Sequence, residues 1–270
     1  RIRLMEETGY VTEPIWLLTR SGVQEVLEAA AAEEEPVYEF TSDFAGESEL
    51  SGIENRIFKV PEASSLGAKL KALTAGGPLY IADGHHRYHS ALRMGLKQCI
   101  AYVCQADQAR IQAYNRVIRG RRPFAEIKDQ LPLKRETAFA TPRRHHFAVY
   151  TREGIYSYGI EQADESDVVG RLDCRLLENT LYPLLELEHS LINDQRYFDY
   201  YAESELVWMQ KEVDEGRYDI AVALHPVDPE ELMAVAEAGT GDPRIVMPEK
   251  STFFAPKILS GLFLIRTEKR

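Results

Sequence analysis

The sequence lacks the features that mark secreted, membrane or fibrous proteins. It has only three cysteines, Cys99, Cys104 and Cys174, and an odd number cannot pair completely. We interpret them as reduced thiols of the kind found in the cytoplasm. The sequence has no internal repeat, low-complexity tract or visible secretory signal, and its most apolar late stretch, residues 258–265, is too short to span a bilayer. The sequence therefore predicts a cytoplasmic protein without a membrane partner.

Basic residues are also in deficit. The formal net charge is -11, and this excess of negative charge repels a phosphodiester backbone or an anionic membrane. The 44% of hydrophobic residues over 270 positions supply enough apolar surface for one large core or two moderate ones. We therefore expect a globular protein whose ligand is a small molecule and not a nucleic acid. The composition does not predict an oligomeric state.

One stretch combines a strand, a sharp turn and a helix. The apolar residues 79–82 have the length of a buried strand, and the run stops at Asp83 and Gly84, a pair that favours a turn. Apolar residues then recur at three- and four-residue spacing up to Gly95, which stands where a C-capping glycine is common. The pattern predicts a junction between a strand and a helix.

The start of this helix carries the side chains of an anion site. His85, His86 and Arg87 follow the turn directly, where a helix exposes unpaired N–H groups and the positive end of its dipole. Phosphate is the anion that this combination favours. Asp83 is then a base or a Mg²⁺ ligand in phosphoryl transfer, or simply the N-cap of the helix. Arg87 either binds the phosphate or forms an ordinary surface salt bridge.

The histidines also allow a zinc site. His85 and His89 are four residues apart on one helical face, as in the HExxH motif of metalloproteases. His86 stands where that motif needs its glutamate base, and no third ligand follows at a recognisable spacing. A metal-dependent hydrolase is therefore the weakest of three functional hypotheses.

Two later segments hold further polar candidates. Asn115 and Arg116 lie in a short apolar strand pattern, where a charged residue either faces solvent, as the sequence favours, or points inward to a ligand. Lys250 and Ser251 lie in a polar loop flanked by prolines and would suit a phosphate clamp, although the loop lacks the glycines of a Walker A motif.

Helical and extended patterns alternate along the chain. Residues 1–120 predict an α+β unit built on a mixed sheet, and residues 121–270 predict a second α/β region whose terminal loop returns to the site. The basic segment 119–122 is either the boundary between the two or a solvated loop inside one domain. An antiparallel pair is expected at residues 37–40 and 53–60, and a hairpin at residues 146–150 and 154–160. A helical pattern covers residues 172–187, with Asp173 as its expected N-cap, and residues 228–231 open another helix.

Three segments in the same order resemble one prokaryotic family, catalogued as domain of unknown function number one thousand and fifteen. They are residues 81–88 (Ile-Ala-Asp-Gly-His-His-Arg-Tyr), residues 114–119 (Tyr-Asn-Arg-Val-Ile-Arg) and residues 247–257, which contain Met-Pro-Glu-Lys-Ser-Thr. His89 and Glu249 depart from the family pattern, which more often has an acidic residue and a proline there. The family also carries an N-terminal region ahead of this portion. Since the chain opens on Arg1, we expect an upstream part to be missing.

The Asp-Gly-His-His-Arg element is also similar to that of the ParB, sulfiredoxin and free-serine-kinase group, where it binds nucleotide phosphates. This resemblance implies a ParB/sulfiredoxin-like core, ATP or ADP with Mg²⁺ as cofactor, and a kinase acting on a serine-like hydroxyl. The alternative is a non-catalytic module that senses a nucleotide. On this basis we assign Asp83 and His86 as catalytic residues and no resident metal ligand. The predicted phosphate contacts are Gly84, His85, Arg87, Asn115, Arg116, Lys250 and Ser251.

Overall fold

The structure is a computed structural model that describes residues 2–42, 52–255 and 258–267. Residues 256 and 257, the end of the third motif, lie outside the described residues. The chain divides into two compact units, which are treated separately below. Unit 1 comprises Arg1–Arg110 and Phe254–Arg270, and unit 2 comprises Ile111–Phe253. The division falls before the predicted boundary at residue 120, because residues 115–118 form an inner strand of the sheet of unit 2.

Within its described residues, unit 1 contains a mixed three-stranded sheet and four α-helices. The central strand of that sheet, β2, is parallel to β6 and antiparallel to β5, so the mixed α+β architecture expected for this region is confirmed. Its helices are α1 (Ile2–Thr8), α2 (Val23–Glu33), α3 (Ser65–Ala75), α4 (His85–Arg93) and the 3₁₀ turn η1 (Ala106–Gln108). Its strands are β1 (Tyr10–Val11), β2 (Ile15–Thr19), β3 (Tyr38–Ser42), β4 (Ile53–Ile57), β5 (Tyr80–Asp83), β6 (Ala101–Gln105) and β15 (Ile265–Arg266).

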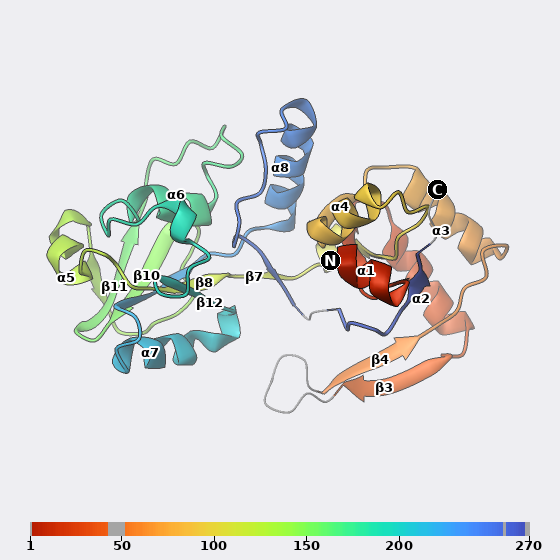
Figure 1. Ribbon diagram of the computed structural model, residues 1–270, viewed down its shortest axis with the longest axis horizontal. Coiled ribbons are helices and arrows are strands. Elements are labelled where there is room, and N and C mark those ends of the chain that lie inside the picture. Colours follow the sequence, from red (N-terminus) through yellow and green to blue (C-terminus); the bar gives the residue numbers. More distant parts are fainter. Residues whose placement is uncertain (1, 43–51, 256–257, 268–270) are drawn as a thin grey trace. The chain divides into compact units, whose positions relative to one another are not determined.

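The small core of unit 1 forms around β2. Trp16 is 5% exposed, and its ring packs edge-on against Tyr102 with 5.3 Å between centroids. The predicted antiparallel pair is present as the hairpin β3–β4, which Figure 1 shows as a long two-stranded ribbon. The last strand of the chain, β15, pairs with β1 near its beginning. Residues from both ends of the sequence therefore build unit 1.

Unit 2 is organised around one six-stranded sheet with the order β12-β8-β13-β10-β11-β9, in which each neighbouring pair is antiparallel. The expected hairpin is β10–β11. The strands are β7 (Ile111–Gln112), β8 (Asn115–Ile118), β9 (Lys134–Glu136), β10 (His146–Thr151), β11 (Gly154–Gly159), β12 (Phe198–Tyr201) and β13 (Ile220–Leu224), while β14 (Phe253–Phe254) spans the unit boundary. The helices are α5 (Phe124–Ile127), η2 (Lys128–Gln130), α6 (Asp173–Thr180), η3 (His189–Leu191), η4 (Glu203–Glu205), α7 (Leu206–Asp214) and α8 (Pro229–Gly241).

Side chains of β8 point alternately to the two faces of this sheet, as strand geometry requires. Val117 packs against Met209 and Val213 of α7. The neighbouring Arg116 bonds instead to Tyr182, which follows α6. Figure 1 shows α6 and α7 on opposite sides of the sheet. An arginine at this position is consequently enclosed by the fold.

The starts of two expected helices have different outcomes. The helix expected to open at residues 228–231 is α8, and the Asp228 carboxylate caps it by accepting a hydrogen bond from the Glu230 N–H at 2.8 Å. The prediction for Asp173 is wrong. The N-cap of α6 is Leu172, and Asp173 lies inside the first turn of the helix, where its carboxylate bonds to a different segment.

Candidate functional site

The junction between β5 and α4 forms as the sequence predicts. β5 ends at Asp83 and α4 begins at His85, so Gly84 alone makes the turn. Gly84 has φ +95°, in the left-handed region that residues with a Cβ rarely adopt. It is also the N-cap of α4, and no side chain caps the helix. The alternative reading of Asp83 as N-cap is therefore wrong.

Arg87 binds two carboxylates. Its Nη2 donates to Oδ2 of Asp83 at 2.9 Å, and its Nη1 donates to Oε2 of Glu13 at 2.7 Å. The Arg87 side chain is only 15% exposed, so the simple surface salt bridge considered above does not describe it. Glu13 precedes β2 and was not a sequence candidate, since nothing local marks it as a partner of the junction. The guanidinium holds Asp83 in place and is itself largely neutralised.

Gly84 also makes room for this guanidinium. A Cβ at Gly84 would lie 2.8 Å from Nη2 and 2.9 Å from Nε of Arg87, which is shorter than a normal contact. The Nε atom is buried and has no hydrogen-bond partner among the described residues. The glycine therefore serves both the turn and the packing of Arg87.

The start of α4 keeps free donors. The first backbone hydrogen bond of the helix runs from the Tyr88 N–H to the Gly84 carbonyl at 3.0 Å, so the N–H groups of residues 85–87 precede the bonded turns. Desolvation lowers the pKa of His85, the neighbouring His89 and His86 lower it further, and Asp83 opposes them. Near neutral pH, His85 therefore acts through hydrogen bonds and not as a cation.

The described part of the chain contains no group of three or more His, Cys, Asp or Glu side chains that could hold a metal ion. His85 and His89 share a helix but are not joined there by a third ligand of these types. The hydrolase hypothesis thus gains no support from the residues around α4.

The remaining predicted site residues belong to unit 2. Arg116 is 3% exposed, so the reading that it faces solvent is wrong. Its guanidinium donates to the Tyr182 hydroxyl at 2.8 Å and to the carbonyls of Tyr114 and Lys250, each at 3.2 Å. It also lies 5.7 Å from the centroid of the Tyr200 ring. Burial disfavours its charge, but the oxygens of Tyr182 and Tyr200 and the Cys174 sulfur raise the pKa of Arg116 and keep it protonated.

Asn115, Ser251 and Lys250 differ in how far the protein's own contacts already use their polar atoms. The Asn115 Oδ1 accepts from the Leu224 N–H at 3.1 Å, and the Ser251 hydroxyl donates to the Pro248 carbonyl at 2.6 Å, so both oxygens serve the fold. The Lys250 ammonium lies 5.2 Å from the Tyr200 ring centroid, a cation–π contact. Lys250 has φ +57°, an uncommon backbone for a lysine. The Asn115 Nδ2 is buried and has no hydrogen-bond partner among the described residues. All three residues stay predicted phosphate contacts.

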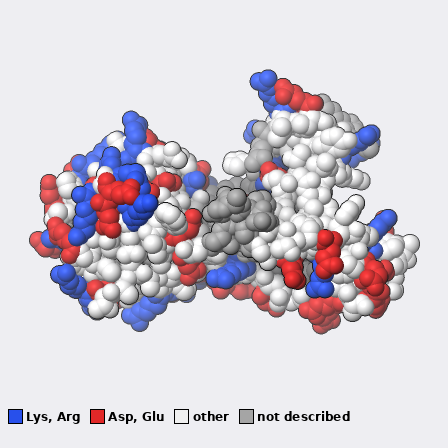
Figure 2. All heavy atoms as spheres, turned by 90° about the horizontal axis from the view of Figure 1, so that it is seen from below, with Lys and Arg blue, Asp and Glu red and all other residues white. Residues whose placement is uncertain are grey.

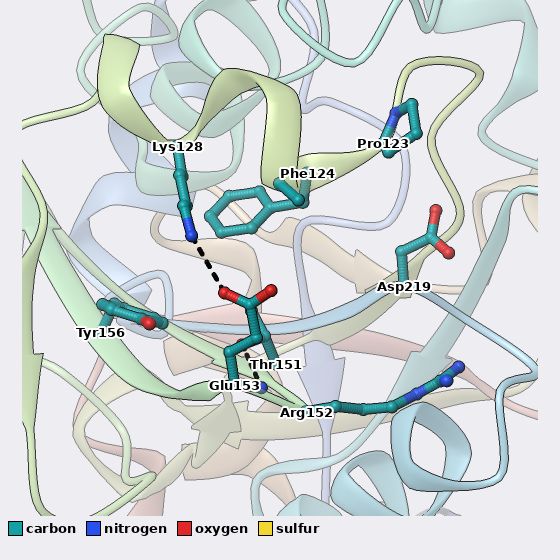
Figure 3. A pocket seen from close by; sticks show the side chains of 9 residues that line it. Pro123, Phe124, Lys128, Thr151, Arg152, Glu153, Tyr156 and Asp219 are labelled. Carbon is teal, nitrogen blue, oxygen red and sulfur yellow. Dashed lines mark hydrogen bonds and ion pairs between the residues drawn. The ribbon is translucent and has the colours of Figure 1, made fainter.

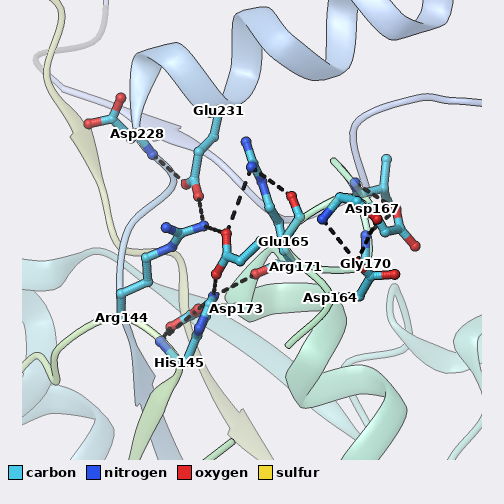
Figure 4. A network of polar contacts seen from close by, with 12 residues as sticks. Arg144, His145, Asp164, Glu165, Asp167, Gly170, Arg171, Asp173, Asp228 and Glu231 are labelled. Atoms are coloured by element: carbon cyan, nitrogen blue, oxygen red, sulfur yellow. Dashed lines mark hydrogen bonds and ion pairs between the residues drawn. The ribbon is translucent and has the colours of Figure 1, made fainter. Parts of the chain in front are cut away.

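A polar network that the sequence did not reveal joins three segments of unit 2 (Figure 4). Both Asp173 oxygens accept from the His145 N–H at 3.0 Å, and Arg144 bridges Glu165 and Glu231 at 3.2 and 2.8 Å. Asp173 is 5% exposed, and its burial raises the pKa to about 6. No spacing in the sequence indicates these contacts, since they link residues far apart in the chain.

Unit 2 also holds a cavity of about 240 Å³ beside α5 (Figure 3). Phe124 forms an apolar part of its wall. The Lys128 ammonium and the Glu153 carboxylate both line it and lie 3.0 Å apart, so these two charges compensate each other. The Lys128–Glu153 pair therefore contributes no net charge to the wall of the cavity.

Charge is mixed on one face of the molecule (Figure 2). On the face of the described residues drawn in Figure 2, basic and acidic side chains are interspersed. None of the helices in the described ranges combines the length and apolar character needed to cross a membrane.

Comparison with known sequences decides the family. The signature of the family described as protein of unknown function (DUF1015) matches residues 1–175, about two thirds of the chain. The chain belongs to the DUF1015 family. The match includes the first two of the three motifs noted in the sequence. No curated protein matches the sequence.

Solved structures give more distant similarities to this DUF1015 chain. Free serine kinase in complex with AMP is 13% identical, with 99% of this chain and 82% of that chain covered and a TM-score of 0.47. A conserved hypothetical protein from Pyrococcus furiosus is 11% identical, with coverage of 99% and 85% and a TM-score of 0.43. SbnI with a C-terminal truncation from Staphylococcus aureus is 11% identical, with coverage of 96% and 75% and a TM-score of 0.49.

Proposed function

We propose that unit 1 binds the phosphate groups of a nucleotide at the start of α4 and transfers a phosphoryl group to a small, serine-like hydroxyl compound. The observation that carries the proposal is the position of Asp83. Its carboxylate is held by Arg87 and lies directly before Gly84, the N-cap of α4. No side chain of the described residues caps this helix, so its first N–H groups can bind an anion. The ligand class is the one named for free serine kinase in complex with AMP or ADP, but the proposal rests on the junction itself.

Each part of the junction has a role in this reaction. The N–H groups of residues 85–87 and the imidazoles of His85 and His86 would donate to phosphate oxygens and stabilise the charge of the transition state. Asp83 would take the proton of the attacking hydroxyl. That oxygen bonds to phosphorus while the bond to the departing nucleotide oxygen breaks.

Asp83 also fits a magnesium ion brought by the nucleotide. Mg²⁺ in such sites commonly takes one or two carboxylates together with phosphate oxygens and water. The Asp83 side chain is 44% exposed, and Arg87 binds its Oδ2 atom. The ion would neutralise charge on the phosphates. Asp83 thus serves as the base or as the metal ligand.

One observation favours the alternative, a module that senses a nucleotide without catalysis. The Arg87 guanidinium is shared between Asp83 and Glu13, so its charge is already compensated. A phosphate clamp needs a cation that is free to turn toward the ligand. If Arg87 keeps both partners when a nucleotide binds, the junction holds a ligand but contributes less to transfer.

Calorimetric titration with ATP and ADP, each with and without Mg²⁺, measures binding directly. In a separate denaturation experiment, a ligand at 100 times its Kd should raise the free energy of unfolding by about 2.7 kcal/mol. His85→Ala should weaken binding, whereas His189→Ala, at an exposed histidine of unit 2, should leave it unchanged. The absence of binding to every nucleotide would refute the proposal.

Turnover separates the kinase from the sensor. Incubation with a nucleotide and serine or related hydroxyl compounds should give a phosphorylated product. Asp83→Asn should abolish product formation while nucleotide affinity changes by less than about threefold. A protein that binds nucleotides but forms no product with any hydroxyl compound would be the sensing module.

A further inference from the structure

A hollow of about 600 Å³ lies against the side of α4, next to the proposed phosphate site. Its walls come from two helices of unit 1, α1 and α4. We call it the α4 hollow and define it by the residues that line it, which are Ile2, Arg3, His86, His89, Ser90 and Arg93. His86 belongs to both the hollow and the β5–α4 junction.

The lining residues of α4 form one continuous row. His86, Ser90 and Arg93 stand at positions i, i+4 and i+7, which share one face of an α-helix. At 1.5 Å per residue, the row extends about 10 Å along the helix axis. A ligand that contacts both ends must therefore be elongated.

Every ionisable side chain that lines the hollow is basic, in a chain whose net charge is -11. The Arg3 Nε donates to Glu7 at 2.8 Å, so part of its charge is compensated. Arg93 has no carboxylate partner within the described ranges. The cavity of unit 2 differs, because Lys128 and Glu153 pair within its wall (Figure 3). The α4 hollow therefore favours an anion.

We propose that the α4 hollow binds a chain of linked phosphates, either free oligophosphate or the phosphate chain of a nucleoside triphosphate. His86 binds the phosphate nearest the junction, and Arg93 binds the phosphate at the far end. Guanidinium and hydroxyl groups donate hydrogen bonds to phosphate oxygens, and imidazoles do so through their ring N–H. The inference deepens the proposed function, on which it rests for the position of His86.

Chain length provides the test. Titration calorimetry with orthophosphate, pyrophosphate and tripolyphosphate, without added metal, compares ligands that differ only in reach and charge. We expect tripolyphosphate to bind roughly tenfold or more tightly than orthophosphate. Arg93→Gln should weaken tripolyphosphate binding roughly tenfold and orthophosphate binding less than about twofold. Arg56→Gln removes the same charge from the exposed hairpin strand β4 and should change neither value.

The outcomes distinguish the inference from the proposed function. Equal tripolyphosphate affinities of the wild-type and Arg93→Gln proteins would overturn the inference, even if nucleotides bind and require His85. Equal effects of Arg93→Gln and Arg56→Gln would also overturn it, because they would show only a loss of general charge. Arg93-dependent binding of tripolyphosphate supports the inference, including in a protein that binds no nucleotide, where the proposed function would fail alone.

Discussion

The guanidinium of Arg87 donates from Nη1 to Oε2 of Glu13 across 2.7 Å, although 74 positions separate the two residues in the chain. Their side chains are 15% and 22% exposed. The contact links the segment before β2 to α4, and the second bond of Arg87 extends the link to the end of β5. Arg87 thus connects three parts of unit 1.

Arg87→Ala should destabilise the protein by about 3 kcal/mol. The change removes two charge-assisted hydrogen bonds and leaves the carboxylates of Glu13 and Asp83 without their shared cation, and each such bond contributes about 1.5–3 kcal/mol. Urea denaturation measures the loss. Arg3→Ala breaks the exposed pair with Glu7 and should cost less than about 1 kcal/mol. Equal decreases in the free energy of unfolding in the two variants would show that the Arg87 contacts stabilise the protein no more than an exposed ion pair does.

Gly84→Ala should cost more than Gly95→Ala, although both glycines have positive φ, +95° and +66°. An alanine in such a backbone costs of order 1–3 kcal/mol. At Gly84 the new methyl group also meets the Arg87 guanidinium at 2.8 Å, whereas nothing lies within 4 Å at Gly95. Thermal denaturation of the two variants gives the difference, and equal destabilisation would contradict the packing role of Gly84.

Asp173 should make stability depend on pH. Burial raises its pKa from 3.8 to about 6, so the folded protein holds a proton that the unfolded chain releases at lower pH. Stability from this group is therefore complete below pH 4, is lost as pH rises toward 6, and stays lost above it. The difference corresponds to about 3 kcal/mol.

Asp173→Asn should remove this dependence. Its carboxamide cannot ionise, and its oxygen can still accept from the His145 N–H. Denaturation at pH 4, 5, 6 and 7 should show the variant gaining stability relative to the wild-type protein as pH rises. Parallel profiles for the two proteins would rule out the assignment.

Arg116→Met should destabilise unit 2 by about 3 kcal/mol. The substitution leaves the Tyr182 hydroxyl and the carbonyls of Tyr114 and Lys250 without their donor in a buried region. Tyr182→Phe removes only one acceptor and should cost about 1 kcal/mol. Hydrogen exchange should also speed up over residues 247–251 in Arg116→Met and not in Tyr182→Phe. Unchanged exchange there would mean that Arg116 does not anchor that loop.

Local features of the fold could be predicted because they depend on neighbours in the sequence. The β5–α4 junction follows from an apolar run that stops at Asp83 and Gly84. The start of α8 follows from residues 228–231, and in the structure Asp228 and Glu231 satisfy each other's backbone N–H groups within one turn. Such signals require no knowledge of the tertiary structure.

The partners of charged residues could not be predicted in the same way. Arg116 reads as a solvent-facing residue because charged side chains in strands usually face water, and only the packing of the β8 face near α6 encloses it. Asp173 stands at the start of a helical pattern, where an aspartate usually caps the helix. Its actual partner, the His145 N–H, lies 28 residues earlier, and no local pattern indicates that contact. No pattern in the sequence indicated that Glu13 is a partner of Arg87. The α4 hollow likewise depends on α1, which the sequence does not connect with α4.

The pairing of β1 with β15 has a consequence for how the protein is made. Tyr10 lies opposite Arg266, and all of unit 2 is encoded between them. A ribosome therefore releases every residue of unit 2 before it releases β15. The sheet of unit 2 uses residues 115–224 and can close while unit 1 still lacks its last strand. A translation stop within residues 111–253 would deprive unit 1 of that strand, although the stop lies in the other unit.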